Sequence, residues 1–232
     1  MILRINIDSA SHDIRFIQYD IAYPGTGLIP DEISSKFQDY YGKDEAVILY
    51  SSGTTGKRKG IILSHYAINT NADAIADYMR LTPTDRIYIA KTLAHSSTLT
   101  GELLVGLKNN TGIIIAPTAT FPRIGLANML KFQASIVCLN PTLLRLYALA
   151  RKQGEGAGSL RAIYTSGAQA NVEVLNQAKE AFFGAQILNA YGLTEAGPRV
   201  TAQRIDDSCA RIGSVGKPIS GVQVKIIKSG NE

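Results

Sequence analysis

Cysteine is scarce in this chain, and long apolar runs are missing from it. The two cysteines, Cys138 and Cys209, lack the spacing of metal ligands, which favours a reduced, cytoplasmic protein. The N-terminal stretch MILRINIDSASHDIRF contains no apolar segment of the kind that a signal peptide carries. No apolar run approaches the ~20 residues that a transmembrane helix needs, so we expect no membrane span.

Clusters of basic residues are also missing. The chain carries 24 Lys and Arg against 19 Asp and Glu, which gives a net charge of +5, but the basic residues are scattered. This distribution favours a solvated basic surface, and we expect no nucleic-acid partner. The 232 residues, 45% of them hydrophobic, are enough for one sizeable core, or for one large domain with a small appendage.

Short aliphatic runs alternate with longer amphipathic stretches. The runs predict strands, the first of them buried, at 46–50, 60–63, 86–90, 112–117, 135–139, 160–167, 185–192 and 222–227. The longer stretches predict helices at 64–81 (with Ser64 as its cap), 99–107, 123–132, 141–150 and 171–183. Continuous aliphatic strands that alternate with helices predict an α/β fold, with mostly parallel sheets flanked by helices.

Three of these strands end in polar loops, at 51–59, 165–169 and 191–195. Ligands of parallel sheets bind beyond the carboxyl ends of the strands. We therefore expect the three loops to gather at one edge of the sheet.

The first loop, within YSSGTTGKRKG (50–60), combines hydroxyl groups, glycines and cations. Successive amides in such a loop can form an anion-binding nest, which suits a polyphosphate. It is not a Walker A loop, because only Thr54 and Thr55 separate Gly53 from Gly56, and Arg58 stands where Ser or Thr is required. The alternative is a solvated hairpin turn.

The loop at 191–195 lies within NAYGLTEAGP (189–198) and carries an aromatic ring, a hydroxyl and a carboxylate. Tyr191 can stack on a purine. Glu195 can bind Mg²⁺, which is typically held by one or two carboxylates and by phosphate oxygens. The alternative is that Tyr191 is half-buried and Glu195 caps a helix.

Together, SSGTTGKRKG and YGLTE resemble the adenylate-forming superfamily of acyl-CoA synthetases, nonribosomal peptide synthetase adenylation domains and luciferases. Nine of the ten positions of the family's phosphate loop agree, and its Tyr-Gly-x-Thr-Glu motif is complete at 191–195. YTSGAQA (164–170) is similar to the adenine-side loop, and GSVGKPISG (213–221) to a further family segment. The resemblance runs from about residue 40 to the C-terminus.

The resemblance implies activation of a small carboxylic acid by ATP and Mg²⁺, with release of pyrophosphate. The acyl group would then pass to coenzyme A or to a pantetheine carrier. By carry-over, the catalytic residues are Thr194, Glu195 and Lys59, with Glu195 as the metal ligand. The ATP phosphates would be bound by Ser51, Ser52, Gly53, Thr54, Thr55, Gly56 and Lys59. The adenine would be bound by Gly167, Ala168, Ala190, Tyr191 and Gly192.

The acyl subsite is expected around TLAHSSTLTGEL (92–103), where His95 matches a histidine common in acyl- and aryl-CoA synthetases. No aspartate lies between Lys91 and Gly101 to pair with a substrate ammonium. An unpaired ammonium is costly to desolvate, which favours an acid without an α-amino group. The alternatives are a structural His95 and an amino-acid adenylation domain.

The resemblance also implies that the chain is incomplete at both ends. We expect residues 1–40 to be an incomplete N-terminal part of the large domain, 41–221 the AMP-binding core and 222–232 the start of a following β segment. The family's ribose-binding aspartate and C-terminal lysine domain have no counterpart, and Arg58 replaces the proline of the phosphate loop. The activity therefore implies missing domains or a complementary chain. The alternative is a non-catalytic relative that binds a nucleotide, an acyl group or a partner subunit.

Overall fold

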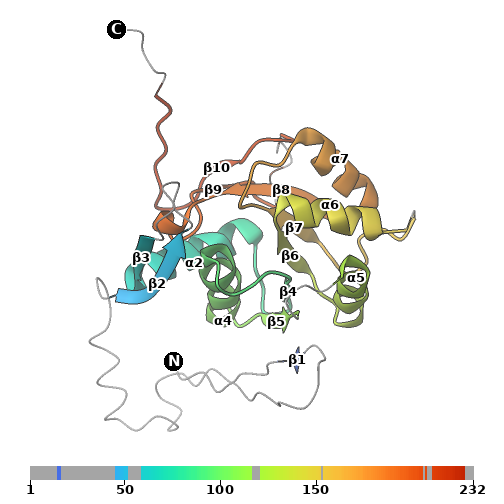
Figure 1. Cartoon of the computed structure of the whole chain (residues 1–232), viewed down its shortest axis with the longest axis horizontal. Coiled ribbons are helices and arrows are strands. Elements are labelled where there is room, and N and C mark those ends of the chain that lie inside the picture. Colours follow the sequence, from blue (N-terminus) through green and yellow to red (C-terminus); the bar gives the residue numbers. More distant parts are fainter. Residues whose placement is uncertain are drawn as a thin grey trace.

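A computed structural model of the protein describes residues 15–16, 45–51, 59–116, 121–152, 154–205, 207 and 211–227. The main sheet has the strand order β1-β5-β4-β6-β7-β8-β9-β10 (Figure 1). Its strands are β1 (Arg15–Phe16), β4 (Arg86–Ile89), β5 (Gly112–Ile115), β6 (Ile136–Leu139), β7 (Ala162–Thr165), β8 (Gln186–Tyr191), β9 (Thr201–Ala202) and β10 (Lys217–Pro218).

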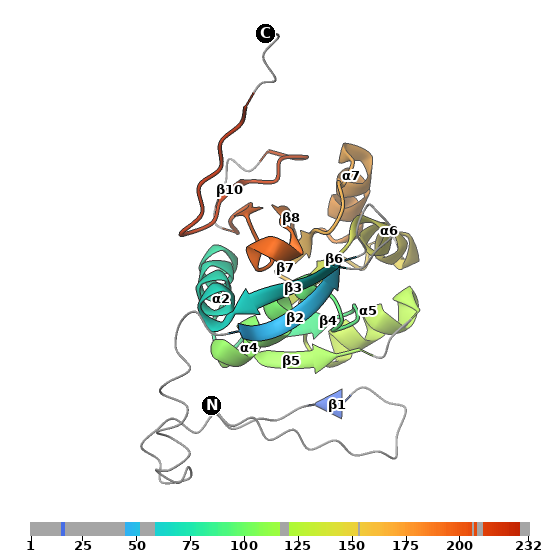
Figure 2. The same ribbon diagram turned by 60° about the vertical axis from the view of Figure 1, so that its left-hand side comes forward.

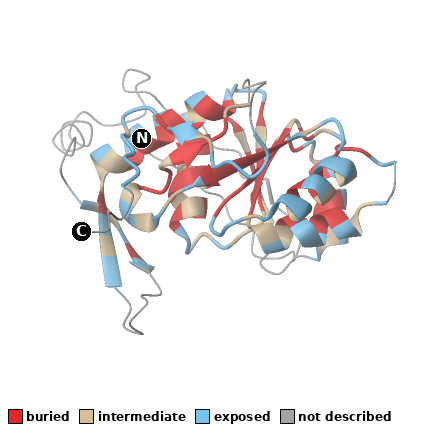
Figure 3. Ribbon diagram, turned by 90° about the horizontal axis from the view of Figure 1, so that it is seen from above, coloured by how far each residue is buried: buried red, intermediate tan, exposed pale blue. Residues whose placement is uncertain are grey.

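The five central strands, from β5 to β8, are parallel, and antiparallel strands flank them on both sides. All four residues of β6 and of β7 are buried, as expected for aliphatic strands that are covered on both faces (Figure 3). The predicted α/β class, with a mostly parallel sheet flanked by helices, is confirmed.

Helices cover both faces of the main sheet. Val137 and Leu139 of β6 pack toward α5 (Pro122–Lys131), α6 (Pro141–Ala150) and α7 (Val172–Ala181). Ile136 and Cys138 of the same strand pack toward α2 (His65–Met79) and α4 (Leu104–Lys108). The alternation of side chains along β6 therefore divides the core into two layers.

The helices α2 and α6 begin where the sequence predicts, and a side chain caps the N-terminus of each. The Ser64 hydroxyl accepts a hydrogen bond from the backbone N–H of Ala67, at 3.2 Å, and this confirms the predicted cap of α2. Asn140 caps α6 in the same way, and Pro141 is its first residue. Each such cap satisfies one of the N–H groups that have no partner inside the helix.

The strand predicted at 46–50 is confirmed as β2 (Glu45–Ser51), but the prediction that it is buried is wrong. It pairs antiparallel with β3 (Lys59–Ser64) in a separate two-stranded sheet. Figure 2 shows the two strands side by side, with α2 directly after β3. Leu49 packs against Leu63 and Ile68, whereas Ile48 and Tyr50 are exposed. Only one face of the hairpin is covered, so its side chains alternate between buried and exposed.

A second correction concerns residues 222–227, where the sequence predicts a strand. They form no regular element, and Ile226 and Ile227 are exposed. A strand needs a neighbouring strand for its backbone hydrogen bonds, and no segment in the described part of the chain pairs with this one.

Candidate active site

Two of the predicted loops meet at one edge of the main sheet. β7 and β8 are parallel neighbours, with Thr165 opposite Asn189, so the segments that follow both strands leave the sheet at its carboxyl edge. Gly167 has a φ of +91° and is exposed together with Ala168. The side chain of Tyr191, at the end of β8, is 51% exposed. This exposure leaves the Tyr191 ring available for stacking, whereas Ala190 is buried in the core.

Gly192 lies where the chain passes very close to itself. A Cβ atom at this position would overlap the carbonyl oxygen of Pro198. The backbone N–H of Val200 also donates to the carbonyl of Tyr191, at 2.9 Å. The segment between these residues is therefore a closed loop, which a larger residue at position 192 would force open.

This loop contains η2 (Thr194–Ala196), a single turn of 3-10 helix. Thr194 Oγ1 shares a hydrogen bond with Ser96 Oγ, at 3.1 Å. Glu195 is exposed on the same turn. One exposed carboxylate fits Mg²⁺, whose remaining ligands are commonly substrate phosphates and water. No cluster of three or more His, Cys, Asp or Glu side chains that could hold a metal occurs among the residues that the structure describes.

Three buried polar atoms at the same edge were missed by the sequence reasoning as site atoms. They are Thr165 Oγ1, Ser166 Oγ and Asn189 Oδ1, and none has a hydrogen-bond partner within the described ranges. The Asn189 side-chain amide is oriented, because its Nδ2 donates to the carbonyl of Ser214, at 3.0 Å. Buried polar atoms are nearly always paired, so these three need partners that water or a ligand would supply. The available signal was a polar residue inside each aliphatic strand.

The predicted phosphate loop lies largely outside the described residues. Ser52, Gly53, Thr54, Thr55 and Gly56 all belong to that part of the chain, and only the backbone of Ser51 is described. Ser51 ends β2 and pairs with Lys59, the exposed first residue of β3. The loop therefore connects two antiparallel strands, and it does not follow a strand of the main sheet. β3 also contacts η2, so the hairpin lies beside the segment that carries Glu195.

The segment expected to bind the acyl group lies next to η2. His95 is exposed and directly precedes α3 (Ser96–Thr98), which continues into η1 (Leu99–Leu103), a turn of π-helix. Because Ser96 bonds Thr194, the position of His95 is fixed relative to η2. π-helical turns are frequent at functional sites.

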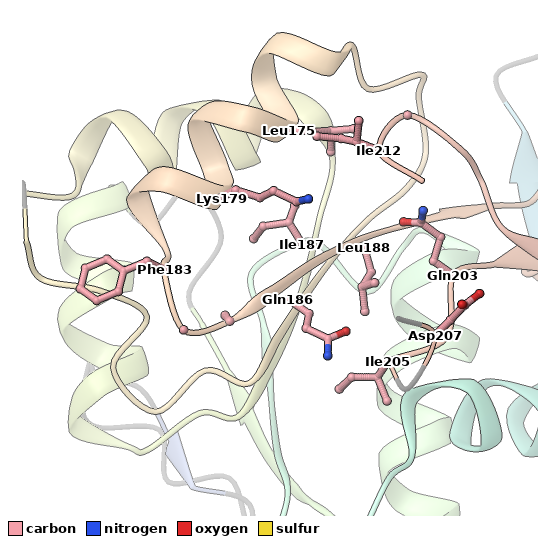
Figure 4. Close-up of a pocket in the computed structure, with 13 residues that line it drawn as sticks. Leu175, Lys179, Phe183, Gln186, Ile187, Leu188, Gln203, Ile205, Asp207 and Ile212 are labelled. Carbon is pink, nitrogen blue, oxygen red and sulfur yellow. The ribbon is translucent and has the colours of Figure 1, made fainter. Parts of the chain in front are cut away.

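A cavity of about 500 Å³ lies away from this edge (Figure 4). Its wall is formed by residues of α7, of β8 from Gln186 onward, and by Gln203, Ile205, Asp207, Ile212 and Gly213. None of the predicted site residues lines it. The carboxyl edge of the sheet, and not this cavity, brings the predicted site residues together.

None of the described helices is both long and apolar enough to cross a membrane.

Comparisons with known proteins agree with these features. The family model described as "AMP-binding enzyme" matches residues 23–232, and so begins before the predicted start near residue 40. Oxalate–CoA ligase of Saccharomyces cerevisiae is 31% identical over 185 residues, which are 79% of this chain and 33% of that protein. Surfactin synthase subunit 3 of Bacillus subtilis is 28% identical over 218 residues, 90% of this chain and 17% of that protein.

Among solved structures, O-succinylbenzoate coenzyme A synthetase from Bacillus subtilis, in complex with ATP and a magnesium ion, is similar with a TM-score of 0.69 and 25% identity. The match covers 82% of this chain and 38% of that chain. This chain thus spans about a third of the two ligases that it matches, and less of the synthase subunit. The chain belongs to the AMP-binding enzyme family.

Proposed function

We propose that this chain is the ATP-binding part of an enzyme that activates a carboxylic acid as an acyl-adenylate. The observation that carries the proposal is the carboxyl edge of β7 and β8. An exposed aromatic ring, an exposed carboxylate and three buried, unpaired polar atoms lie together there. A nucleotide bound to a metal ion matches the exposed ring, on which a base can stack, and the exposed carboxylate, which can hold the ion.

The adenine base is assigned to the Tyr191 side of this edge. Its ring would stack on Tyr191, which is about half exposed at the end of β8. Gly167, Ala168 and Gly192 add no bulk that would obstruct the base, and Ala190 is buried on the other face of β8.

The phosphates are assigned to η2 and to the loop between β2 and β3. Thr194 would contact the α-phosphate and Glu195 would bind Mg²⁺. Lys59, with Ser51, Ser52, Gly53, Thr54, Thr55 and Gly56, would hold the outgoing phosphates. A carboxylate oxygen attacks the α-phosphorus, the bond from that phosphorus to the bridging oxygen breaks, and pyrophosphate leaves. Hydrogen-bond donors and Mg²⁺ stabilise the negative charge that builds on the phosphate oxygens.

The acid is assigned to the segment that carries His95. This segment has no aspartate for an α-ammonium group, so we propose an acid without one. The names of oxalate–CoA ligase and O-succinylbenzoate coenzyme A synthetase support such an acid, and also coenzyme A as the acceptor. A pantetheine carrier is the other acceptor of this kind. The similarity to surfactin synthase subunit 3 keeps an amino acid as the alternative substrate, which tight binding of a free α-amino acid would favour.

The test is ATP–pyrophosphate exchange by this chain with Mg²⁺ and a panel of aliphatic, aryl and amino acids. We expect exchange that depends on one class of acid, and a loss of about 100-fold or more in Glu195→Gln. Because Glu195 is exposed, this substitution should leave the unfolding midpoint in urea unchanged.

Exchange without any added acid, or full exchange by Glu195→Gln, would contradict the proposal. ATP binding without exchange would instead support the non-catalytic alternative.

A further inference from the structure

Helix α2 holds the loop that carries Thr194 and Glu195 in place through hydrogen bonds. The side-chain amide of Asn71, in the middle of this helix, donates to the carbonyl oxygens of Ala196, at 3.2 Å, and of Arg199, at 2.8 Å. The backbone N–H of Arg199 donates to Asn71 Oδ1, at 3.2 Å. One buried side chain thus makes three hydrogen bonds to backbone that is more than a hundred residues away in sequence.

Arg199 supplies a second attachment of the same loop to α2. Its side chain is 1% exposed, and its Nε donates to the hydroxyl of Tyr78, at 3.3 Å. Burial lowers the pKa of Arg199, but Tyr78, Cys138 and Glu102 outweigh this and raise the pKa above its ordinary value. The guanidinium group therefore stays charged inside the protein.

η1 encloses this guanidinium group from another side. A Cβ atom on Gly101 would lie 3.5 Å from Arg199 Nη2, at ordinary van der Waals distance, so η1 packs closely beside the guanidinium group. The next residue, Glu102, is fully buried and forms an ion pair with Lys91, at 2.8 Å. Glu102 thus pairs with Lys91, just after β4, and its charge also acts on Arg199.

These polar groups cost free energy to bury, which an apolar set of similar shape would not. The core layer around these polar groups consists of apolar side chains, among them Ile75, Val105 and Leu188. Hydrogen bonds and charges add direction, however, since they fix the backbone of residues 196–199 in one orientation. Ser96 fixes Thr194, just before this stretch, in a similar way.

We propose that Asn71 and Arg199 are positioning residues, which hold η2 so that Thr194 and Glu195 face the nucleotide phosphates and the metal ion. Neither residue touches the nucleotide itself. This inference rests on the function proposed for the carboxyl edge of β7 and β8. It adds Asn71 of α2 and Arg199 of the loop to the residues on which that function depends.

The test compares Asn71→Ala and Arg199→Met with the control Arg161→Met. Alanine favours helix formation, so Asn71→Ala should fold even if Arg199→Met does not. Arg161 pairs with the buried carboxylate of Asp85, at 2.7 Å, next to the amino ends of β4 and β7 and away from the proposed site. The control thus also loses an arginine that is bonded to α2, because Arg161 Nη2 donates to the carbonyls of Met79 and Arg80 at the C-terminal end of this helix. It removes no hydrogen bond to residues 194–199.

Two measurements separate positioning from general stability. The first is hydrogen exchange of the amides of Ala196, Gly197 and Val200, which are hydrogen-bonded within the loop. We expect about tenfold faster exchange in both test variants, because each loses hydrogen bonds to this segment, and no local change in Arg161→Met. The second is the Kd for ATP with Mg²⁺, expected to rise about 10- to 100-fold in the test variants only.

Unchanged exchange of the three amides would overturn the inference, and so would an unchanged Kd for ATP in both test variants. If the wild-type chain does not bind ATP with Mg²⁺, the proposed function fails. Faster exchange in Asn71→Ala would then show only a structural contact, so the two failures can be told apart.

Discussion

Gly192 controls how tightly the loop at the candidate site can close. Its Cα lies so near the Pro198 carbonyl group that there is no room for a Cβ atom. The Pro198 peptide is not free to move alone, because Asn71 holds the carbonyls of Ala196, two residues before it, and of Arg199, directly after it. A side chain at position 192 must therefore displace the loop as a unit or distort β8.

We expect Gly192→Ala to lower the free energy of unfolding by about 1–3 kcal/mol, as overpacking of a well-packed site does. ATP binding should weaken as well, because η2 moves together with the Pro198 peptide. Urea unfolding and a titration with ATP and Mg²⁺ measure the two effects.

The matched control is Gly184→Ala. Gly184 has a φ of +95°, but no atom lies within 4 Å of the position that its Cβ would take. This substitution should cost only the backbone strain, about 1 kcal/mol, and should leave ATP binding unchanged. A Gly192→Ala variant that binds ATP as well as this control would argue against the close approach.

At the scale of elements, the hairpin β2–β3 differs from the main sheet. One face of the hairpin packs on a small cluster that contains Leu49, Leu63 and Ile68, and the other exposes Ile48 and Ile62. By contrast, β6 and β7 are buried on both faces. A two-stranded sheet is marginally stable by itself, so the hairpin depends on its contact with α2.

We therefore expect the hairpin to open in a local unfolding step of lower free energy than global unfolding. In native-state hydrogen exchange, the amides of Ile48 and Ile62 should exchange faster than those of Val137 and Ile163. Low concentrations of urea should accelerate the central strands while leaving the hairpin nearly unaffected, because local opening exposes little surface. Equal protection of the two sheets would show that they unfold as one unit.

Most elements between residues 59 and 191 could be predicted from sequence, because local patterns determine them. Aliphatic runs such as 135–139 matched their strand, and 141–150 matched its helix to the residue. The failures depend on partners that are remote in sequence. Neither the separate hairpin sheet nor the irregular stretch 222–227 can be deduced from a run of apolar residues, since such a run does not specify which segment covers it or pairs with it.

At the scale of the whole molecule, sequence reasoning predicted that loops after parallel strands would meet, and the loops after β7 and β8 do meet. It placed Thr165 in the polar loop 165–169 but assigned no role to its hydroxyl or to the side-chain oxygen of Asn189, which are buried there without a hydrogen-bond partner among the described residues. It also missed the contacts between Asn71 and Arg199, which are 128 positions apart. No local pattern joins such residues, so only the folded chain reveals the pair. The roles of the predicted site residues stay predictions.

The opposite edge of the sheet should control the stability of the whole molecule in acid. Asp85 is buried there and accepts hydrogen bonds from Arg161, Ser135 and Thr82. Burial raises the pKa of Asp85, but these bonds outweigh it and hold the pKa below the ordinary value of 3.8. A depressed pKa stabilises the fold fully above that ordinary value, and the stabilisation is lost as the pH falls through the lowered pKa.

We expect Asp85→Asn to lower the free energy of unfolding by about 1–3 kcal/mol at pH 7, because it weakens the hydrogen bonds to the partly exposed Arg161. The difference between the variant and the wild type should shrink below about pH 3.8, because Asp85 of the unfolded wild type is protonated there while the lowered pKa keeps the folded carboxyl ionised to a lower pH. Urea unfolding of both proteins at pH 7 and near pH 3 measures this difference.

Burial raises the pKa of Glu102 against the effect of Lys91, so that this carboxyl favours the fold more at low pH. Glu102 is present in both proteins, however, and its effect cancels in the difference. A difference that stays constant between the two pH values would mean that Asp85 does not stabilise the fold through its charge.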